Sequence, residues 1–267
     1  MRLRVTLLAG GLLSLATVLL AHDLFLKLDS YFLDANTTAR VPVLNGTFAT
    51  SENSVTRNRI AAITLVSPER TAALDTTVWS VKGDTSYVAI RVGSPGTYVL
   101  GASVRPNTLS MTAAEFNAYL EEDGITDMLE TRRRRGELER PARERYSKHV
   151  KAIFQVGERP GDKYGAILGY PAEIVPLTNP YDVRVGGELA VRCLVDGRPV
   201  EVTVLAGGEG ASGAIAQRSV RSGADGVARV PIVAAGRWYV KFVHMAEVSE
   251  AELDYESKWA TLTFEVR

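Results

Sequence analysis

Three histidines are the residues of this sequence best suited to transition-metal chemistry: His22, His149 and His244. His22 directly follows an amino-terminal apolar run, so cleavage after Ala21 would make it the first residue of the chain. A terminal histidine offers its α-amine and its imidazole Nδ1 to one metal ion, and this chelate needs only one or two further nitrogen or oxygen ligands. Such a site suits Ni(II), Co(II) or Cu(II).

His244 ends an apolar run, and a segment rich in carboxylates follows it. A histidine at the rim of a strand beside carboxylates can be a metal ligand. The sequence therefore predicts a metal site made by His22, His244 and one carboxylate, from Asp254 or Glu256. The alternative for His244 is a core-edge histidine bonded to a backbone carbonyl. For His149, which follows a lysine in a basic segment, the pattern favours a solvated position on a helix.

No sequence motif supports a catalytic site. Residues 208–213 read G-E-G-A-S-G, which has the glycine spacing of a dinucleotide-binding loop. That loop binds phosphate only where a helix begins directly after it, and here a strand-like run follows, so we expect a hairpin and no nucleotide cofactor. Neither the G-x-S-x-G turn of hydrolases nor the H-E-x-x-H helix of metalloproteases is present. We therefore expect no catalytic residue and a protein that is not an enzyme.

The amino-terminal segment has the layout of a secretory signal peptide. Arg2 and Arg4 precede an apolar run over 5–20, and the small residue Ala21 follows it. The run is shorter than the roughly 20 apolar residues that span a membrane comfortably. Cleavage after Ala21 is favoured over an uncleaved anchor, although Leu19 stands where a small residue usually precedes the cut. The sequence thus predicts a signal peptide over 1–21, a periplasmic location and no integral membrane segment after cleavage.

Charge and cysteine content exclude further classes of protein. The chain has 31 Lys and Arg against 31 Asp and Glu, whereas general nucleic-acid binders concentrate positive charge to neutralise phosphates. The single cysteine, Cys193, has no disulfide partner, and it falls on the apolar side of an alternating run with Leu189, Val191 and Val195. A buried thiol is expected there.

Short apolar runs separated by turn residues indicate an all-β fold made of two β-sandwich domains. We expect the first domain over 22–168 and the second over 169–267. Thr112 and Glu115 have the spacing of a capping box, which opens a helix. A helical insertion is therefore expected over about 110–151, at the end of the first domain, with its last helix around 143–148.

Five segments together resemble a bacterial family of secreted proteins described as NikM-like periplasmic components of cobalt or nickel uptake. Taken singly none of them is specific, but in this order they extend over nearly the whole chain after the signal peptide. They are A-H-D-L-F at 21–25, R-Y-S-K-H-V-K-A at 145–152, E-I-V-P-L at 173–177, N-P-Y at 179–181 and Y-E-S-K-W-A-T-L-T-F at 255–264.

The resemblance implies a periplasmic protein with immunoglobulin-like or transthyretin-like β-sandwich domains that handles a divalent transition metal. It places the family's post-signal histidine on His22 and the histidine before the acidic loop on His244. No membrane helices follow the β domains in this sequence, unlike in the nickel-transport component, so the expected partner is a separate membrane permease. Two alternatives stay open: a scaffold or adhesion module without metal, and a copper-dependent oxidative enzyme that uses the terminal histidine.

Overall fold

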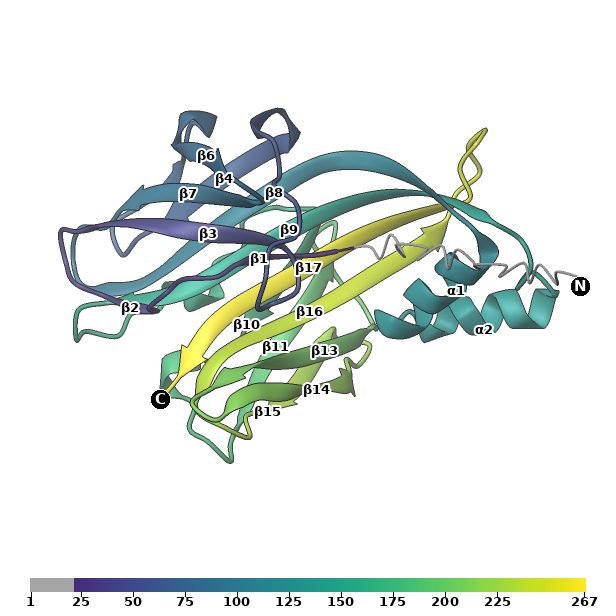
Figure 1. The fold of residues 1–267 in the computed structure, drawn as a ribbon. Helices are drawn as coiled ribbons and strands as arrows, with labels where there is room; N and C mark the ends of the chain where they lie inside the picture. Colours follow the sequence, from purple (N-terminus) through teal and green to yellow (C-terminus); the bar gives the residue numbers. More distant parts are fainter. Residues whose placement is uncertain (1–21) are drawn as a thin grey trace, which may run out of the picture.

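One large mixed sheet runs through the chain, and smaller sheets cover its two faces. The structure is a computed structural model that describes residues 22–267, so the predicted signal peptide lies outside the described residues. The central sheet has nine strands in the order β14-β13-β16-β17-β9-β8-β4-β5, with β2 beside β9 (Figure 1). Their bounds are β2 Phe32–Leu33, β4 Ile60–Val66, β5 Thr71–Ala73, β8 Gly96–Met111, β9 Ala142–Val156, β13 Thr203–Gly210, β14 Gly213–Arg221, β16 Gly236–Glu247 and β17 Tyr255–Val266.

The two covering sheets come from different halves of the chain. One has the strand order β1-β3-β7-β6, and the other has β11 paired with β10, β12 and β15. Neighbouring residues of the central strands point to opposite sides, so Leu100 and Ala152 are buried under the first covering sheet, and Val99 and Ile153 under the second. We call these sides the first face and the second face. The covering strands are β1 Asp23–Leu26, β3 Thr38–Gly46, β6 Trp79–Lys82, β7 Thr85–Arg91, β10 Ala172–Pro176, β11 Glu188–Val195, β12 Arg198–Pro199 and β15 Val227–Pro231.

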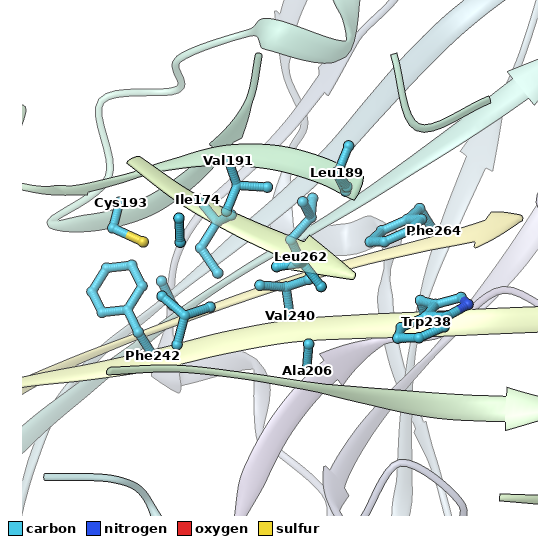
Figure 2. Close-up of a cluster of buried hydrophobic side chains, with 14 of the residues drawn as sticks. Ile174, Leu189, Val191, Cys193, Ala206, Trp238, Val240, Phe242, Leu262 and Phe264 are labelled. Carbon is cyan, nitrogen blue, oxygen red and sulfur yellow. The ribbon is translucent and has the colours of Figure 1, made fainter. Parts of the chain in front are cut away.

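The core of the second face is built by apolar residues that alternate along each strand. Trp238, Val240 and Phe242 of β16 point to the same side and meet Val191 and Cys193 of β11 (Figure 2). Burying one such side chain contributes about 1.5–3 kcal/mol. The prediction of a buried thiol is confirmed, and burial raises the pKa of the Cys193 thiol to about 12.

The two halves of the chain meet inside the central sheet. β17 pairs in parallel with β9, from Tyr255 opposite Glu144 to Thr263 opposite Ala152. The sheet therefore continues across the domain boundary predicted near residue 169. The fold-class prediction is confirmed, since the chain is mostly strand and its sheets pack face to face.

Two α-helices lie at one end of the long strands and pack on the first face (Figure 1). They are α1, Ala113–Glu122, and α2, Thr126–Arg135. The predicted capping box is confirmed, because Thr112 Oγ1 accepts from the Glu115 N–H at 3.3 Å and the Glu115 carboxylate accepts from the Thr112 N–H at 2.8 Å. No helix within residues 22–267 is both long and apolar enough to span a membrane.

The helical insertion is shorter than predicted, because the third predicted helix is wrong. Residues 143–148 lie in β9, which is hydrogen-bonded to β8 on one side and to β17 on the other. Long-range pairing here overrides the local helical preference of a charged segment. The remaining helices are single 3₁₀ turns, at η1 Arg57–Arg59, η2 Thr76–Val78, η3 Lys163–Gly165 and η4 Pro180–Asp182.

The glycine-rich segment 208–213 forms the predicted hairpin between β13 and β14. Its glycines serve strand packing: a Cβ on Gly208 would collide with the carbonyl oxygen of Arg237 on the neighbouring strand β16. The backbone of β13 can therefore approach β16 only with glycine at this position.

A buried ion pair fastens a loop to the second face. The Lys151 ammonium pairs with the Glu173 carboxylate, and their side chains are 3% and 2% exposed. Lys151 Nζ also donates to the carbonyl of Ala166 at 3.0 Å, and Glu173 accepts from the N–H groups of Leu168 and Tyr170, each at 2.9 Å. The pair thus holds the chain between η3 and β10 in place.

His149 is buried in β9 and is not solvated on a helix. Its Nδ1 lies 2.9 Å from Ser103 Oγ and its Nε2 lies 3.0 Å from Ser147 Oγ. Burial lowers the pKa of His149 to about 4, and the nearby Lys258 adds a smaller effect in the same direction. The imidazole is therefore neutral at pH 7 and fixed between two hydroxyl groups.

Lys151→Met should lower the free energy of unfolding by about 3–5 kcal/mol, because it leaves the Glu173 carboxylate buried without a counter-charge. Lys258→Met is the matched control: its partner Asp196 is 61% exposed, and such a pair contributes at most about 1 kcal/mol. Urea unfolding of both variants measures the difference. A loss in Lys151→Met as small as in the control would contradict the structural role of the pair.

His149→Gln should reduce the pH dependence of stability. The unfolded chain binds a proton at His149 near the ordinary pKa of about 6.5, whereas the folded chain binds it only near pH 4. The free energy of unfolding is therefore unaffected above about pH 6.5 and decreases as the pH falls from about 6.5 to about 4. The wild-type loss is at most about 3 kcal/mol, and glutamine has no such titration. Urea unfolding at about pH 7 and about pH 4 measures it. Equal pH dependence in both proteins would refute the assignment.

Candidate functional site

His22 directly precedes β1, and its imidazole faces the carboxylate of Glu52. His22 Nδ1 lies 3.4 Å from Glu52 Oε2, and the two side chains are 25% and 46% exposed, so solvent reaches both. Nδ1 is the imidazole nitrogen that forms a chelate with an α-amine. The pair therefore combines a nitrogen and an oxygen donor at an accessible position.

The loop after β3 brings Glu52 to His22. The Glu52 N–H donates to the carbonyl of Asn45 at 3.0 Å, and Asn45 lies opposite Leu24 in the ladder between β1 and β3. The loop can turn this tightly because residue 46 is glycine, where a Cβ would lie 2.6 Å from the carbonyl oxygen of Thr50. The ladder register and the turn together fix the distance between the two side chains.

Two lysines attach the start of β1 to the first face of the central sheet. Lys148 Nζ donates to the carbonyl of His22, and Lys241 Nζ pairs with the Asp23 carboxylate at 2.6 Å. Lys241 also pairs with Asp123, directly after α1, at 2.8 Å. Lys148 of β9 thus holds the backbone of His22, and Lys241 of β16 links the next residue, Asp23, to the end of α1.

Burial shifts the pKa values of the charges behind His22. It raises the pKa of Asp123 to about 6, although Lys241 acts in the opposite direction. It raises the pKa of Glu144 to about 7, although that carboxylate accepts hydrogen bonds from Ser257 and Tyr119. It lowers the pKa of Lys148 to about 8. Lys148 therefore remains predominantly protonated at neutral pH.

His244 lies on the opposite side of the central sheet from His22. It stands opposite Lys258 in the ladder of β16 and β17, and it points to the second face with Phe242. β1 lies on the first face, where Thr261 donates to its backbone. Layers of sheet pack about 10 Å apart, whereas an imidazole nitrogen binds a metal at about 2 Å. The structure therefore does not bring His22 and His244 together.

The two predicted carboxylate ligands are bonded to arginines of β9 and the segment before it. Asp254 accepts from Arg140 Nη2 and from the N–H of Arg143, both at 2.8 Å, and Glu256 accepts from Arg145 Nε at 2.9 Å. The predicted site of two histidines and one of these carboxylates is therefore not formed. Within residues 22–267 no three His, Cys, Asp or Glu side chains are grouped to hold a metal ion, so a site at His22 requires its α-amine.

Glu52 carries no sequence signal that predicts its contact with His22. It lies in a polar turn segment, S-E-N-S at 51–54, which resembles any exposed loop. The contact depends on the pairing of β1 with β3 and on the tight turn after Gly46, and neither can be recognised from the spacing of the two residues.

Two cavities border the first covering sheet. The larger, about 830 Å³, lies between the β4–β5 hairpin and the β3–β7 pair, and Leu65, Ile90 and Arg91 are among its lining residues. The smaller, about 270 Å³, lies beside His22, since its wall includes Lys148, which bonds to the His22 carbonyl. Only the smaller cavity adjoins the candidate site.

Comparison with known protein families gives one family match, and it covers most of the chain. No curated protein sequence matches. Similar solved structures include the tetra-tandem repeat in the extending region of a large adhesion protein (16% identity, TM-score 0.26, covering 91% of this chain and 49% of that one). Another is dimeric latent PorU from Porphyromonas gingivalis (9% identity, TM-score 0.20, covering 88% of this chain and 19% of that one). A third is Salmonella alpha-2-macroglobulin reacted with methylamine (9% identity, TM-score 0.24, covering 91% of this chain and 15% of that one).

The chain spans less than half the length of each of these solved chains. The family match extends over residues 19–246, from the end of the predicted signal peptide to the last residue but one of β16, and so includes both covering sheets. The chain belongs to the family defined by the domain of unknown function DUF4198.

Proposed function

We propose that the protein is a periplasmic binding protein that carries a divalent transition metal, Ni(II), Co(II) or Cu(II), at His22 and delivers it to a separate membrane permease. The observation that carries the proposal is the 3.4 Å approach of His22 Nδ1 to the Glu52 carboxylate, both accessible to solvent. Cleavage after Ala21 adds the α-amine as a third donor on the same residue. Two nitrogens and one carboxylate oxygen then meet at one point of the surface.

This donor set suits a cargo site better than a permanent cofactor site. Nitrogen and oxygen ligands of this kind bind nickel, cobalt and copper ions. Three protein donors leave coordination positions open for water or for a ligand from a partner protein, so the metal can be passed on by ligand exchange. A binding protein of this kind needs no catalytic residue.

The resemblance to NikM-like periplasmic components supports nickel or cobalt as the cargo and a permease as the receiver. In this proposal Glu52 takes the place of the carboxylates at 254 and 256, and no second histidine takes part. The scaffold module and the copper-dependent oxidative enzyme remain the competing functions. Metal titration separates the scaffold from the binding protein, and an assay for glycan oxidation separates the enzyme.

Protein exported and cleaved after Ala21 should bind one equivalent of Ni(II), Co(II) or Cu(II), measured by calorimetric titration of each ion. His22→Ala and a form with one extra glycine before His22 should each lose at least about 100-fold in affinity, because both remove the chelate. Glu52→Gln should lose about 10-fold, because the amide is a weaker ligand than the carboxylate. Acidification should also weaken binding, since the ligands must be deprotonated.

His244→Ala is the control, because it removes a histidine from the opposite side of the sheet, and it should keep wild-type affinity. Unchanged affinity in His22→Ala would refute the site. Absence of binding for all three ions would favour the scaffold function. Reductant-dependent oxidation of a glycan by the copper-loaded protein would favour the enzyme instead.

A further inference from the structure

The small cavity beside His22 has the lining of an anion site. Its polar wall consists of hydroxyl, amide and cationic side chains, and no carboxylate from residues 22–267 lines it. The apolar residues that line it are Leu24, Val55 and Val104. The polar residues are Asn45, Ser54, Thr56, Arg59, Tyr146 and Lys148.

Arg59 has a donor that nothing in the described chain satisfies. Its Nη2 donates to the carbonyl of Arg105 at 2.9 Å, which fixes the guanidinium at the wall of the cavity. Its Nε is buried and has no hydrogen-bond partner among residues 22–267. Buried donors of native proteins are almost always paired, so this N–H indicates an acceptor that enters the cavity from outside the chain.

Lys148 contributes a second positive charge. Its residue is only 8% exposed, and its Nζ reaches the backbone carbonyl of His22. Neither Lys148 nor Arg59 forms an ion pair with a carboxylate in residues 22–267, whereas the neighbouring Lys241 forms two. Arg59 and Lys148 therefore both line a cavity of about 270 Å³. The carboxylates that act on Lys148 electrostatically, Asp23, Asp123 and Glu144, are not among the residues that line it.

We propose that this cavity binds a small polycarboxylate of the size of citrate, and that the metal at His22 is carried as its complex with that acid. Two cations and several hydroxyl and amide groups match a ligand that has several carboxylate oxygens. The volume of the cavity lies just below the usual range of ligand pockets, so the cavity is too small for a large ligand. Lys148 lines the cavity and donates to the backbone carbonyl of His22, so the cavity lies beside the residue proposed to hold the metal. The second part of this inference rests on the proposed function, and the first part does not.

Calorimetric titration of citrate into the processed, metal-free protein tests the anion site. Wild-type protein should bind one equivalent, and Arg59→Gln should bind at least about 10-fold more weakly, because it loses the charge and the Nε donor. Arg57→Gln is the matched control: Arg57 lies two positions away, bonds to the carbonyl of Trp79 and does not line the cavity, so citrate affinity should stay within about twofold. Thermal unfolding checks that each variant is folded. Equal loss in both variants, or no citrate binding by the wild type, would overturn the anion site.

Two further titrations separate this inference from the proposed function. His22→Ala should still bind citrate while losing nickel, and this outcome supports the cavity even where the metal site fails. In the wild type, nickel affinity should be higher in the presence of citrate than in an inert buffer, when both solutions have the same free nickel concentration. Arg59→Gln should abolish this increase. Nickel binding that is independent of citrate would overturn the inference that the metal is carried as a citrate complex. Inorganic phosphate is the competing anion, and binding as tight as that of citrate would overturn the polycarboxylate assignment.

Discussion

The parallel pairing of β17 with β9 is the constraint on which the rest of the structure depends. These two strands come from opposite halves of the chain, and both lie in the middle of the central sheet, where each face is covered. In β17, Trp259 is buried on the first face and Leu262 on the second. A central strand of this kind cannot show the simple alternation of a half-exposed strand. The central sheet therefore forms one wall of two separate hydrophobic cores, one on each face.

The same pairing determines the surroundings of His22. β1 lies across the first face, and the side chains that hold it, Lys148 and Thr261, come from β9 and β17. The central strands thus place charged and hydroxyl groups below β1, whose residues after Asp23 are apolar. Burying the lysines is unfavourable by itself, and nearby carboxylates and carbonyls offset that cost. The result is a histidine, His22, with a fixed backbone and an accessible imidazole.

Local features of the fold could be predicted from the sequence, and features set by strand pairing could not. The capping box at Thr112, the buried thiol of Cys193 and the hairpin at 208–213 each depend on a few neighbouring residues, and all three are confirmed. The helix expected around 143–148 is wrong because two partners far away in the sequence pull that segment into a sheet. The assignment of His22 as a metal ligand stays a prediction. The contact of His22 with Glu52 and its separation from His244 depend on the register of β1 and on which face β1 covers, which no spacing rule encodes.

The shared sheet also determines what happens when the chain is divided. A fragment that ends near residue 168 would lack β17, so β9 would lose its partner from Glu144 to Ala152 and this stretch would become an unpaired edge. It would also expose the apolar side chains Val99 and Ile153, which the second half covers. A long, flat, apolar edge is a template for pairing with other chains. The second half of the molecule thus protects the first half from self-association.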